Sequence, residues 1–409
     1  MKFPNAPVDR CWAIVNLDAI LQNISALRNL LPKGCSFLAV VKGAAYGHGM
    51  IPIAHTCAKA GVQYLGTATL GEAIELRKAG ITLPILILGV TAPAYTEKLV
   101  HYQLTQIVPS LEYAKELAVR IPENSQRLKI HLKVDTGMGR LGWQTEMETL
   151  PSVCKDILKL AEIDSLYIEG VMTHLSSSRG SSLQAKNYTN HQLTLFRLLC
   201  AELKKQGLSL QYQHALNSGG LASGFPLEST NMVRIGHLLY DSLPGVDRFG
   251  IKTALELKTT IASVKSFPSG AYIGYGQTYK LSHPARIGVL NIGSCDGYPA
   301  CLSNKGEVLL HGIRVPIVGS VCMDQCMVDI TSVPDAEAGD VVTIVGCDGK
   351  DRLSMFDISK QSGGVLSTIF STGFRNRITR YYVQDGELVG KLQVKHSLES
   401  IHKESEEER

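Results

Sequence analysis

Up to Leu243 the chain alternates short apolar runs with longer amphipathic segments. Apolar runs bounded by glycine or proline predict buried strands, and an apolar residue at every third or fourth position predicts a helix. One helix is expected from Asp18 to just before Pro32. Another is expected from the capping box that Thr69 forms with Glu72. Eight strands are predicted, over residues 37–42, 62–67, 85–88, 103–108, 128–134, 168–173, 210–216 and 232–236.

Strands separated by helix-length segments predict parallel β–α–β units, and eight of them predict a closed (β/α)8 barrel. The pattern then changes to Val-, Ile- and Thr-rich segments at 255–267, 287–292, 307–322 and 341–347, separated by turn signals. We therefore expect an α/β protein with a TIM-like barrel over residues 1–245. A mostly β domain is expected over residues 246–385, followed by a charged tail over residues 386–409.

The composition narrows the class of protein. The chain has 409 residues, 44% of them hydrophobic, which is enough for two cores. Its formal net charge of +4 gives no basic field of the kind that nucleic-acid binding needs. Without an apolar signal-peptide core or a membrane-length apolar run, a soluble cytoplasmic protein is expected. Ten irregularly spaced cysteines predict neither a disulfide framework nor a zinc site, and we expect no metal.

Lys42 stands where the first predicted barrel strand leaves the core, directly before a glycine. Burying an ammonium group is unfavourable, so such a lysine either extends to solvent or loses its charge. Taken alone, a strand-end lysine that reaches solvent is the commoner case. A desolvated lysine with a lowered pKa is instead a nucleophile that forms imines with carbonyl compounds. The neighbouring motifs favour this second interpretation.

Four motifs carry a resemblance to a known family: Ala39-Val-Val-Lys42-Gly-Ala-Ala-Tyr46-Gly-His-Gly, Lys133-Val-Asp-Thr-Gly-Met-Gly-Arg140, Gly274-Tyr275-Gly276 and Val321-Cys-Met323-Asp324-Gln. In this order they resemble the alanine racemases, which use pyridoxal 5'-phosphate, and the similarity extends from about Trp12 to about Arg380. The resemblance implies an isomerase that interconverts L-alanine and D-alanine and supplies D-alanine for peptidoglycan. It also implies a head-to-tail homodimer with shared active sites.

In (β/α)8 barrels chemistry is built at the C-terminal ends of the strands. The unusual polar residues of this chain end or follow predicted strands: Lys42, Lys133, Arg140, His174, Asn217, Ser218, Arg234 and Gly236. Alone, the stretch from Asn217 to Gly220 fits an ordinary turn as well as an anion-binding loop, in which glycines let amides approach a phosphate. The resemblance implies that the cofactor phosphate is held by Tyr46, Asn217, Ser218 and the Gly236 amide.

Arg234 lies in an apolar run, which argues against a surface salt bridge. The resemblance implies that it faces the pyridine nitrogen of the cofactor. A guanidinium has only donors and keeps its proton, so the ring nitrogen stays unprotonated and the cofactor is a weaker electron sink. Simple reprotonation at Cα is then favoured over side reactions such as transamination.

Racemisation removes a proton from one face of Cα and delivers one to the other, so two bases are expected. Lys42 is one, and Tyr275 is the candidate for the other. Cations nearby favour a phenolate, and His174 and Arg140 are the candidates for that effect. Judged alone, Gly-Tyr-Gly is more often a turn and His174 a core histidine.

The resemblance assigns further residues to the substrate. Arg140 is expected to meet the substrate carboxylate and the phenolic oxygen of the cofactor, which its planar fork of donors suits. Met323 and Asp324, like Tyr275, are expected to come from the partner subunit. Lys133 matches a lysine that the family often carries as a carbamate, which orients the arginine.

Several positions near the family's substrate entrance depart from its pattern. Ser294, Ala300 and Ser320 replace a tyrosine and two arginines, which predicts a wider and less cationic entrance. Thr368 stands where an aromatic residue is usual, and Ala44 where asparagine or aspartate is common. A serine racemase or a broad-specificity amino-acid racemase is therefore a second candidate function.

Three further functions compete with a racemase. A related amino-acid decarboxylase would hold the ring nitrogen with a carboxylate rather than with Arg234. A non-enzymatic pyridoxal-phosphate-holding barrel would have no use for Tyr275 or a second domain. A degenerate racemase would bind the cofactor and turn over slowly.

Overall fold

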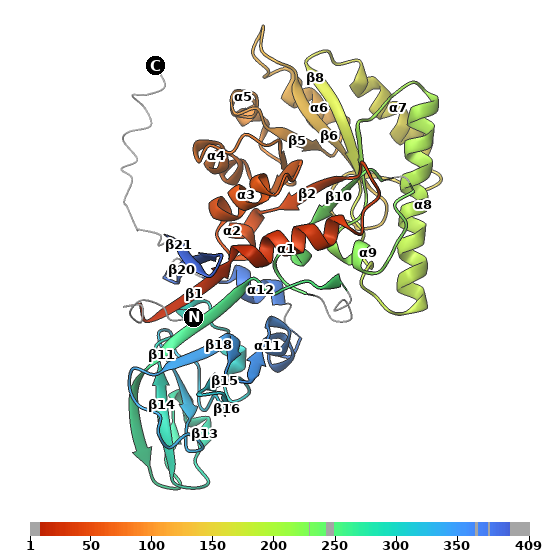
Figure 1. Ribbon diagram of the computed structural model, residues 1–409. Coiled ribbons are helices and arrows are strands. Elements are labelled where there is room, and N and C mark those ends of the chain that lie inside the picture. The colour runs from red at the N-terminus through yellow and green to blue at the C-terminus, as the bar shows by residue number, and fades with distance from the viewer. Residues whose placement is uncertain (1–8, 229, 243–248, 365–366, 375–376, 393–409) are drawn as a thin grey trace. The chain divides into compact units, whose positions relative to one another are not determined.

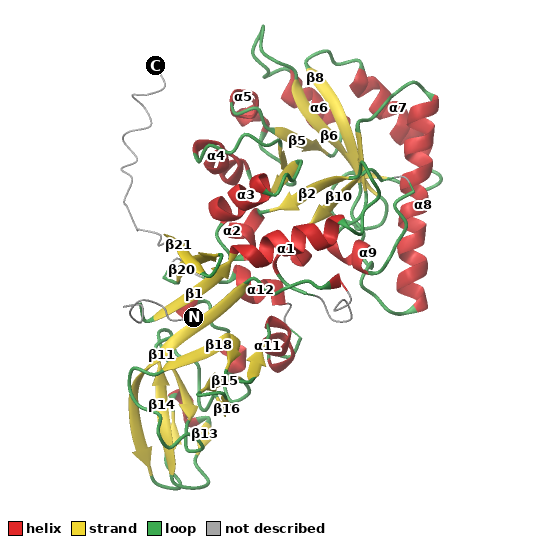
Figure 2. Ribbon diagram, viewed as in Figure 1, coloured by secondary structure: helices red, strands yellow, loops and turns green. Residues whose placement is uncertain are grey.

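The computed structural model describes residues 9–228, 230–242, 249–364, 367–374 and 377–392. The chain divides into two compact units. We call Leu17–Ala254 the barrel unit, and Met1–Asn16 together with Leu255–Arg409 the β unit. Figure 1 gives the labels of the elements, and Figure 2 shows how helices and strands are distributed between them. In the described residues no helix is both long and apolar enough to cross a membrane.

The described part of the barrel unit contains one ring of parallel strands in the order β10, β2, β3, β4, β5, β6, β8, β9. They are β2 (Ser36–Val40), β3 (Tyr64–Thr67), β4 (Ile85–Ile87), β5 (Thr105–Val108), β6 (Leu128–Asp135), β8 (Leu166–Met172), β9 (Tyr212–His214) and β10 (Met232–Ile235). The two-residue β7 (Trp143–Gln144) pairs with the end of β6. The Arg234 amide donates to the Leu216 carbonyl at 3.0 Å, beside a parallel bridge from Arg234 to Asn217. The predicted (β/α)8 barrel is confirmed.

Helices follow the strands around this ring (Figure 1). They are α1 (Leu17–Arg28), α2 (Lys42–Tyr46), α3 (Met50–Lys59), α4 (Leu70–Lys78), α5 (Thr96–His101), α6 (Leu111–Ala118), α7 (Leu150–Ala161), α8 (Leu183–Lys205), α9 (Ser218–Ala222) and α10 (His237–Tyr240). The predicted capping box is present, since the Thr69 hydroxyl accepts from the Glu72 amide at the start of α4.

Strand alternation places the site residues inside the barrel. The interior is packed by a cluster of buried residues: Leu38, Val40, Tyr64, Leu86, Ile107, Met172 and Met232. Side chains two apart on a strand point to the same face, so Arg234 continues the inward row of Met232. Lys42 likewise continues the row of Leu38 and Val40 at the end of β2. Strand alternation therefore places Lys42 and Arg234 at the C-terminal mouth of the barrel.

The β unit is built on one large antiparallel sheet with a parallel pair, in the order β16, β15, β18, β11, β1, β20, β21. Its strands are β1 (Cys11–Asn16), β11 (Leu255–Phe267), β12 (Tyr272–Ile273), β13 (Tyr279–Lys280), β14 (Ala285–Leu290), β15 (Glu307–Leu310), β16 (Ile313–Pro316), β17 (Cys326–Asp329), β18 (Val341–Asp348), β19 (Asp351–Leu353), β20 (Thr379–Gln384) and β21 (Glu387–Leu392). Strand β14 pairs with β11 and β17, and two short helices follow, α11 (Met355–Gln361) and α12 (Ser367–Thr372).

The unit boundaries differ from the predicted domains at both ends of the chain. The pattern assigns residues 1–16 to the barrel, whereas β1 pairs antiparallel with β11 and parallel with β20. It also starts a solvated tail at residue 386, whereas β21 pairs antiparallel with β20. The hydrogen-bonding partners of β1 lie more than two hundred residues away in sequence, so local periodicity could not identify them. The remainder of the predicted tail, residues 393–409, lies outside the described residues.

Candidate active site

Lys42 is followed by a left-handed turn. Gly43, Ala44, Ala45 and Tyr46 have φ values of 62°, 52°, 54° and 53°. L-residues disfavour this conformation by roughly 1–2 kcal/mol each, and such strain is typical of functional sites. The Ala45 amide donates to the Val41 carbonyl at 2.8 Å, which holds the turn closed. The strained turn places Lys42 and Tyr46 at the mouth of the barrel.

The environment of the Lys42 amine favours its neutral form. Burial lowers its pKa, the nearby Arg140 guanidinium lowers it further, and Glu72 opposes both. The Glu72 carboxylate is partly engaged elsewhere, because its Oε1 accepts from the Gly43 amide at 2.7 Å. The Lys42 amine therefore has a lowered pKa, which is the property that the sequence analysis expects of an imine-forming lysine.

Several donors converge where a phosphate is expected. The Ser218 hydroxyl lies 3.1 Å from the Gly236 amide and 3.4 Å from the Leu238 amide. A Cβ added at Gly236 would lie 2.4 Å from the Tyr46 hydroxyl oxygen, so a larger residue here would displace the Tyr46 side chain. Asn217 caps α9 by accepting from the Gly220 amide at 2.9 Å. The residues present fit a phosphorylated cofactor.

Arg234 is a buried cation held by carbonyl groups. Its guanidinium donates to the carbonyls of His214, Thr173 and Ala215 at 2.7, 2.7 and 3.1 Å. It also lies 3.2 Å from the Nδ1 atoms of both His174 and His214. Among the described residues no carboxylate pairs with it. Burial and the Arg140 charge lower the pKa of Arg234 to about 9, and the group remains a cation at neutral pH.

Lys133 and His174 lie near the cationic groups of Arg234 and Arg140. Burial lowers the pKa of Lys133 to about 7, and its Nζ donates to the Val134 carbonyl at 2.7 Å. Burial lowers the pKa of His174 to about 2, with further repulsion from Arg234, Arg140, Lys133 and Lys42. His174 is therefore neutral at pH 7. The positive charges of Arg140 and Arg234 suit a phosphate and a carboxylate.

Asp135 fixes the loop that carries Arg140. Its carboxylate accepts from the amides of Gly137, Met138 and Arg140 at 3.0, 2.6 and 2.7 Å. Burial opposes ionisation, but these hydrogen bonds outweigh it and lower the pKa of Asp135. The sequence analysis did not select Asp135, although Asp-Thr-Gly is a turn signal that points to this role.

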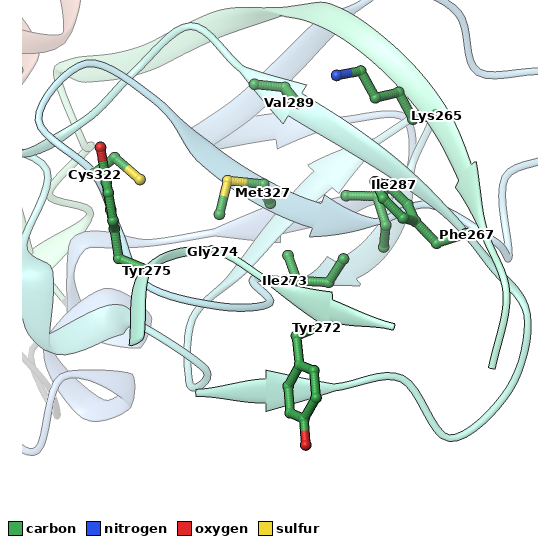
Figure 3. Close-up of a pocket in the computed structure, with 10 residues that line it drawn as sticks. All are labelled: Lys265, Phe267, Tyr272, Ile273, Gly274, Tyr275, Ile287, Val289, Cys322 and Met327. Carbon is green, nitrogen blue, oxygen red and sulfur yellow. The ribbon is translucent and has the colours of Figure 1, made fainter. Parts of the chain in front are cut away.

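Tyr275 lies on the surface of the β unit. Its side chain is 75% exposed, and the Ser320 hydroxyl donates to its carbonyl at 3.0 Å. It borders a cavity of about 390 Å³ whose lining is mostly apolar. Figure 3 shows Tyr275 at one end of the lining residues and Phe267 at the other. An exposed phenol beside a cavity can be contacted by the surface of another protein chain.

Met323 and Asp324 lie in a turn held by a charge network within the β unit. Met323 is 65% exposed. The Arg377 guanidinium lies 2.8 Å from Asp324, and Arg10 and Arg377 lie 2.9 and 3.4 Å from the fully buried Asp296. The sequence analysis did not select Arg10, Arg377 or Asp296, because their meeting depends on long-range pairing.

The structure brings the predicted residues together within each unit. The barrel mouth gathers the residues expected to bind the cofactor and the substrate carboxylate: Lys42, Tyr46, Lys133, Arg140, His174, Asn217, Ser218, Arg234 and Gly236. The β unit carries Tyr275, Met323 and Asp324. The side chain of Thr368 lies outside the described residues.

Comparison with known proteins identifies the family. The alanine racemase N-terminal domain matches residues 15–244 and the C-terminal domain matches residues 254–382. The chain is 37% identical over 358 residues to the alanine racemase of Methanococcus maripaludis, covering 87% of this chain and 94% of the relative. It is 35% identical over 381 residues to alanine racemase 1 of Caldanaerobacter subterraneus, covering 92% and 96%.

Solved structures agree in fold and in length. The alanine racemase of Clostridium difficile 630 superimposes with a TM-score of 0.87 at 31% identity, covering 95% of this chain and 99% of that one. The alanine racemase of Bacillus anthracis, solved with bound L-Ala-P, gives a TM-score of 0.85 at 32% identity and the same coverage. Because both domain models match and full-length relatives are similar, the chain belongs to the alanine racemase family.

Proposed function

We propose that this protein interconverts L-alanine and D-alanine with pyridoxal phosphate attached at Lys42, using Lys42 and Tyr275 as the two bases. The observation that carries the proposal is the barrel-mouth cluster, in which a lysine of lowered pKa lies among cations beside Arg234. A decarboxylase of related fold would place a carboxylate at the Arg234 position. Family membership supports the isomerase reaction directly.

The chain's own residues account for cofactor binding. The hydroxyls of Tyr46 and Ser218 and the Gly236 amide would hold the phosphate, with Asn217 fixing the loop. Burial raises the pKa of Tyr46, so its hydroxyl stays a donor. The bound cofactor supplies an electron sink that acidifies the Cα proton, and Arg234, a donor only, keeps that sink weak.

Proton transfer is assigned to two groups of different chemistry. The Lys42 amine, neutral in part because of burial and Arg140, takes or returns the proton on one face of Cα. Tyr275 serves the other face. Because a guanidinium can only donate, the Nδ1 atom of His174 accepts from Arg234, which fixes the imidazole ring beside the proposed site. Arg140 would bind the substrate carboxylate.

We infer a head-to-tail homodimer in which Tyr275, Met323 and Asp324 of one subunit complete the other's site. The exposure of Tyr275 and Met323 supports this, since buried side chains could not reach a partner. We further infer carbamylation of Lys133, which is supported by its burial and lowered pKa. A cytoplasmic enzyme that supplies D-alanine for peptidoglycan is the role that the family suggests.

A wider substrate range is supported by one contact. Ser320 stands where the family pattern has arginine. Its hydroxyl bonds to the Tyr275 carbonyl and the Thr278 hydroxyl, and it brings no charge to the exposed Tyr275. We expect measurable turnover of L-serine beside L-alanine. Comparing kcat/KM for the two substrates tests this, and a preference of more than about a thousandfold for alanine (~4 kcal/mol) would exclude it.

Borohydride reduction of the purified protein, followed by peptide mapping, tests the cofactor assignment. The expected result is one pyridoxyl group, on Lys42. Modification of another lysine would overturn the assignment. Racemisation of L-alanine should be lost in Lys42→Ala and in Tyr275→Phe, and a racemase that retained full activity in both would refute the two-base proposal.

A further inference from the structure

A continuous line of buried polar groups runs from Arg234 to the opposite end of the barrel. The His214 Nδ1 atom lies 3.2 Å from the Arg234 Nη1, and its Nε2 lies 2.8 Å from the His131 Nδ1. The His131 Nε2 lies 3.1 Å from the Glu169 Oε2. The side chains of His131 and His214 are fully buried, and those of Glu169 and Arg234 nearly so. The line thus joins a buried carboxylate to a buried guanidinium.

The proton positions along this line follow from the chemistry of its two ends. Glu169 is ionised, because hydrogen bonds from His131, Lys129 and Tyr64 outweigh the effect of burial and lower its pKa to about 2. A carboxylate only accepts, so the His131 proton is on Nε2 and its Nδ1 accepts from His214. The His214 proton is then on Nε2, and its Nδ1 accepts from Arg234.

Both rings are neutral in this arrangement. Burial lowers the pKa of His131 and, more strongly, that of His214. Arg234 always donates, so reasoning from that end gives the same ring protons. Only one placement of the ring protons satisfies every hydrogen bond in the line. The two dipolar rings point their lone pairs toward the guanidinium and their protons toward the carboxylate.

The buried cation of Arg234 needs a negatively charged partner. Its direct neighbours are carbonyls and imidazoles, which leave a full positive charge in a dry interior. Glu169 is held firmly, since its Oε2 accepts from Tyr64 at 2.7 Å and its Oε1 from Lys129 at 2.9 Å. Tyr64 is fixed in turn by Thr105 at 2.6 Å.

We propose that Glu169 is the remote counter-charge of Arg234, acting through His131 and His214, and that these three are positioning residues for the guanidinium. This rests on the proposed function, in which Arg234 faces the ring nitrogen of the cofactor. By stabilising the cation and aiming it, the line keeps Arg234 a donor toward that nitrogen. Glu169, at the opposite end of the barrel, thereby affects the chemistry at the barrel mouth.

Neutron diffraction from deuterium-exchanged crystals of the cofactor-loaded protein tests the line without any variant. The expected result is deuterium on Nε2 and none on Nδ1 in both His131 and His214. Deuterium on Nδ1 of either ring would overturn the proposal. This measurement does not depend on racemisation, so it tests the proposed ring protons independently of the proposed function. Failure of the proposed function would instead leave the wild-type protein unable to racemise alanine.

Kinetics of Glu169→Gln test the effect on the site. We expect kcat to fall roughly 10- to 100-fold, the range typical of outer partners that orient a functional group, while KM changes little. The exposed Glu75→Gln on α4 is the matched control and should match wild type. A loss of thermal stability with kcat within threefold of wild type would show a structural role only and overturn the proposal.

A double-mutant cycle decides whether the effect passes through His214. If Glu169 acts along the line, His214→Phe combined with Glu169→Gln loses little more kcat than His214→Phe alone. Losses that multiply would show that the two residues act independently, which contradicts a relay.

Discussion

At the scale of single residues, the turn after Lys42 combines function with strain. Ala44 is exposed and has a φ of 52°, where the family pattern commonly has asparagine or aspartate. Asparagine tolerates this left-handed conformation better than alanine, because its short side chain bonds locally. The sequence showed the substitution, but the conformation that gives it meaning is visible only in the structure.

Ala44→Asn should therefore stabilise the protein. We expect a gain of about 0.5–1 kcal/mol in the free energy of unfolding, because strain is relieved and no packing is lost. Thermal unfolding measures it. Ala201→Asn, at an exposed helical position of α8, is the control and should lose about 0.5 kcal/mol. Destabilisation by Ala44→Asn would contradict the left-handed turn.

Lys133 gives a prediction about pH. Its pKa of about 7 leaves roughly half of the amine neutral at pH 7, compared with less than about 1 in 1,000 for an ordinary lysine. Only a neutral amine reacts with carbon dioxide. The carbamate carbon signal of protein equilibrated with ¹³C-bicarbonate should therefore decline as the pH falls below about 7. Lys133→Met should lack the signal, and an unchanged signal in that variant would refute the assignment.

At the scale of elements, a network of four charges holds the turn that presents Met323. The amides of Ser294 and Cys295 donate to the carbonyls of Cys322 and Met323 at 2.9 and 2.8 Å, which docks the turn on its neighbour. Asp296 is buried below it with two partly exposed arginines. Removing its charge leaves the more exposed Asp324 as the remaining carboxylate partner of both arginines.

Asp296→Asn should loosen this turn. We expect a loss of about 2 kcal/mol in stability, with faster hydrogen exchange at the amides of Ser294 and Cys295. Asp351→Asn removes an exposed ion pair with Arg314 and is the control. It should cost much less stability than Asp296→Asn, because an exposed ion pair is screened by solvent, and it should leave both amides unchanged. Unchanged exchange in Asp296→Asn would show that the network does not hold the turn.

Barrel strands such as β2 and β4 could be predicted from sequence because they are short apolar runs with a local signal. The residues that meet across neighbouring strands could not be predicted in the same way. A register shift between Ile130 and His131 on β6 decides which β8 residue meets which neighbour. Alternation alone therefore could not bring His131 to Glu169. The motif residues of the barrel mouth were predictable, since each lies at or shortly after the end of a strand, whereas the buried line behind Arg234 was not.

At the scale of the whole molecule, the two proposed bases belong to different units. Lys42 lies in the barrel unit, and the exposed Tyr275 lies in the β unit. In a head-to-tail dimer each site takes its lysine from one subunit and its tyrosine from the other. Subunits that carry different defects can then repair each other, which a site confined to one subunit cannot do.

Mixing Lys42→Ala subunits with Tyr275→Phe subunits, each inactive alone, tests this arrangement. Random reassociation makes half of the dimers mixed, and each mixed dimer has one intact site, so about a quarter of wild-type activity should return. A partner carrying both substitutions is the control, because its mixed dimers with Lys42→Ala contain no intact site. Both mixtures staying inactive, with mixed dimers shown to be present, would place both bases in one subunit. Once mixed dimers are shown to form, the appearance of activity depends on which subunit supplies each group, because neither parent dimer contains an intact site.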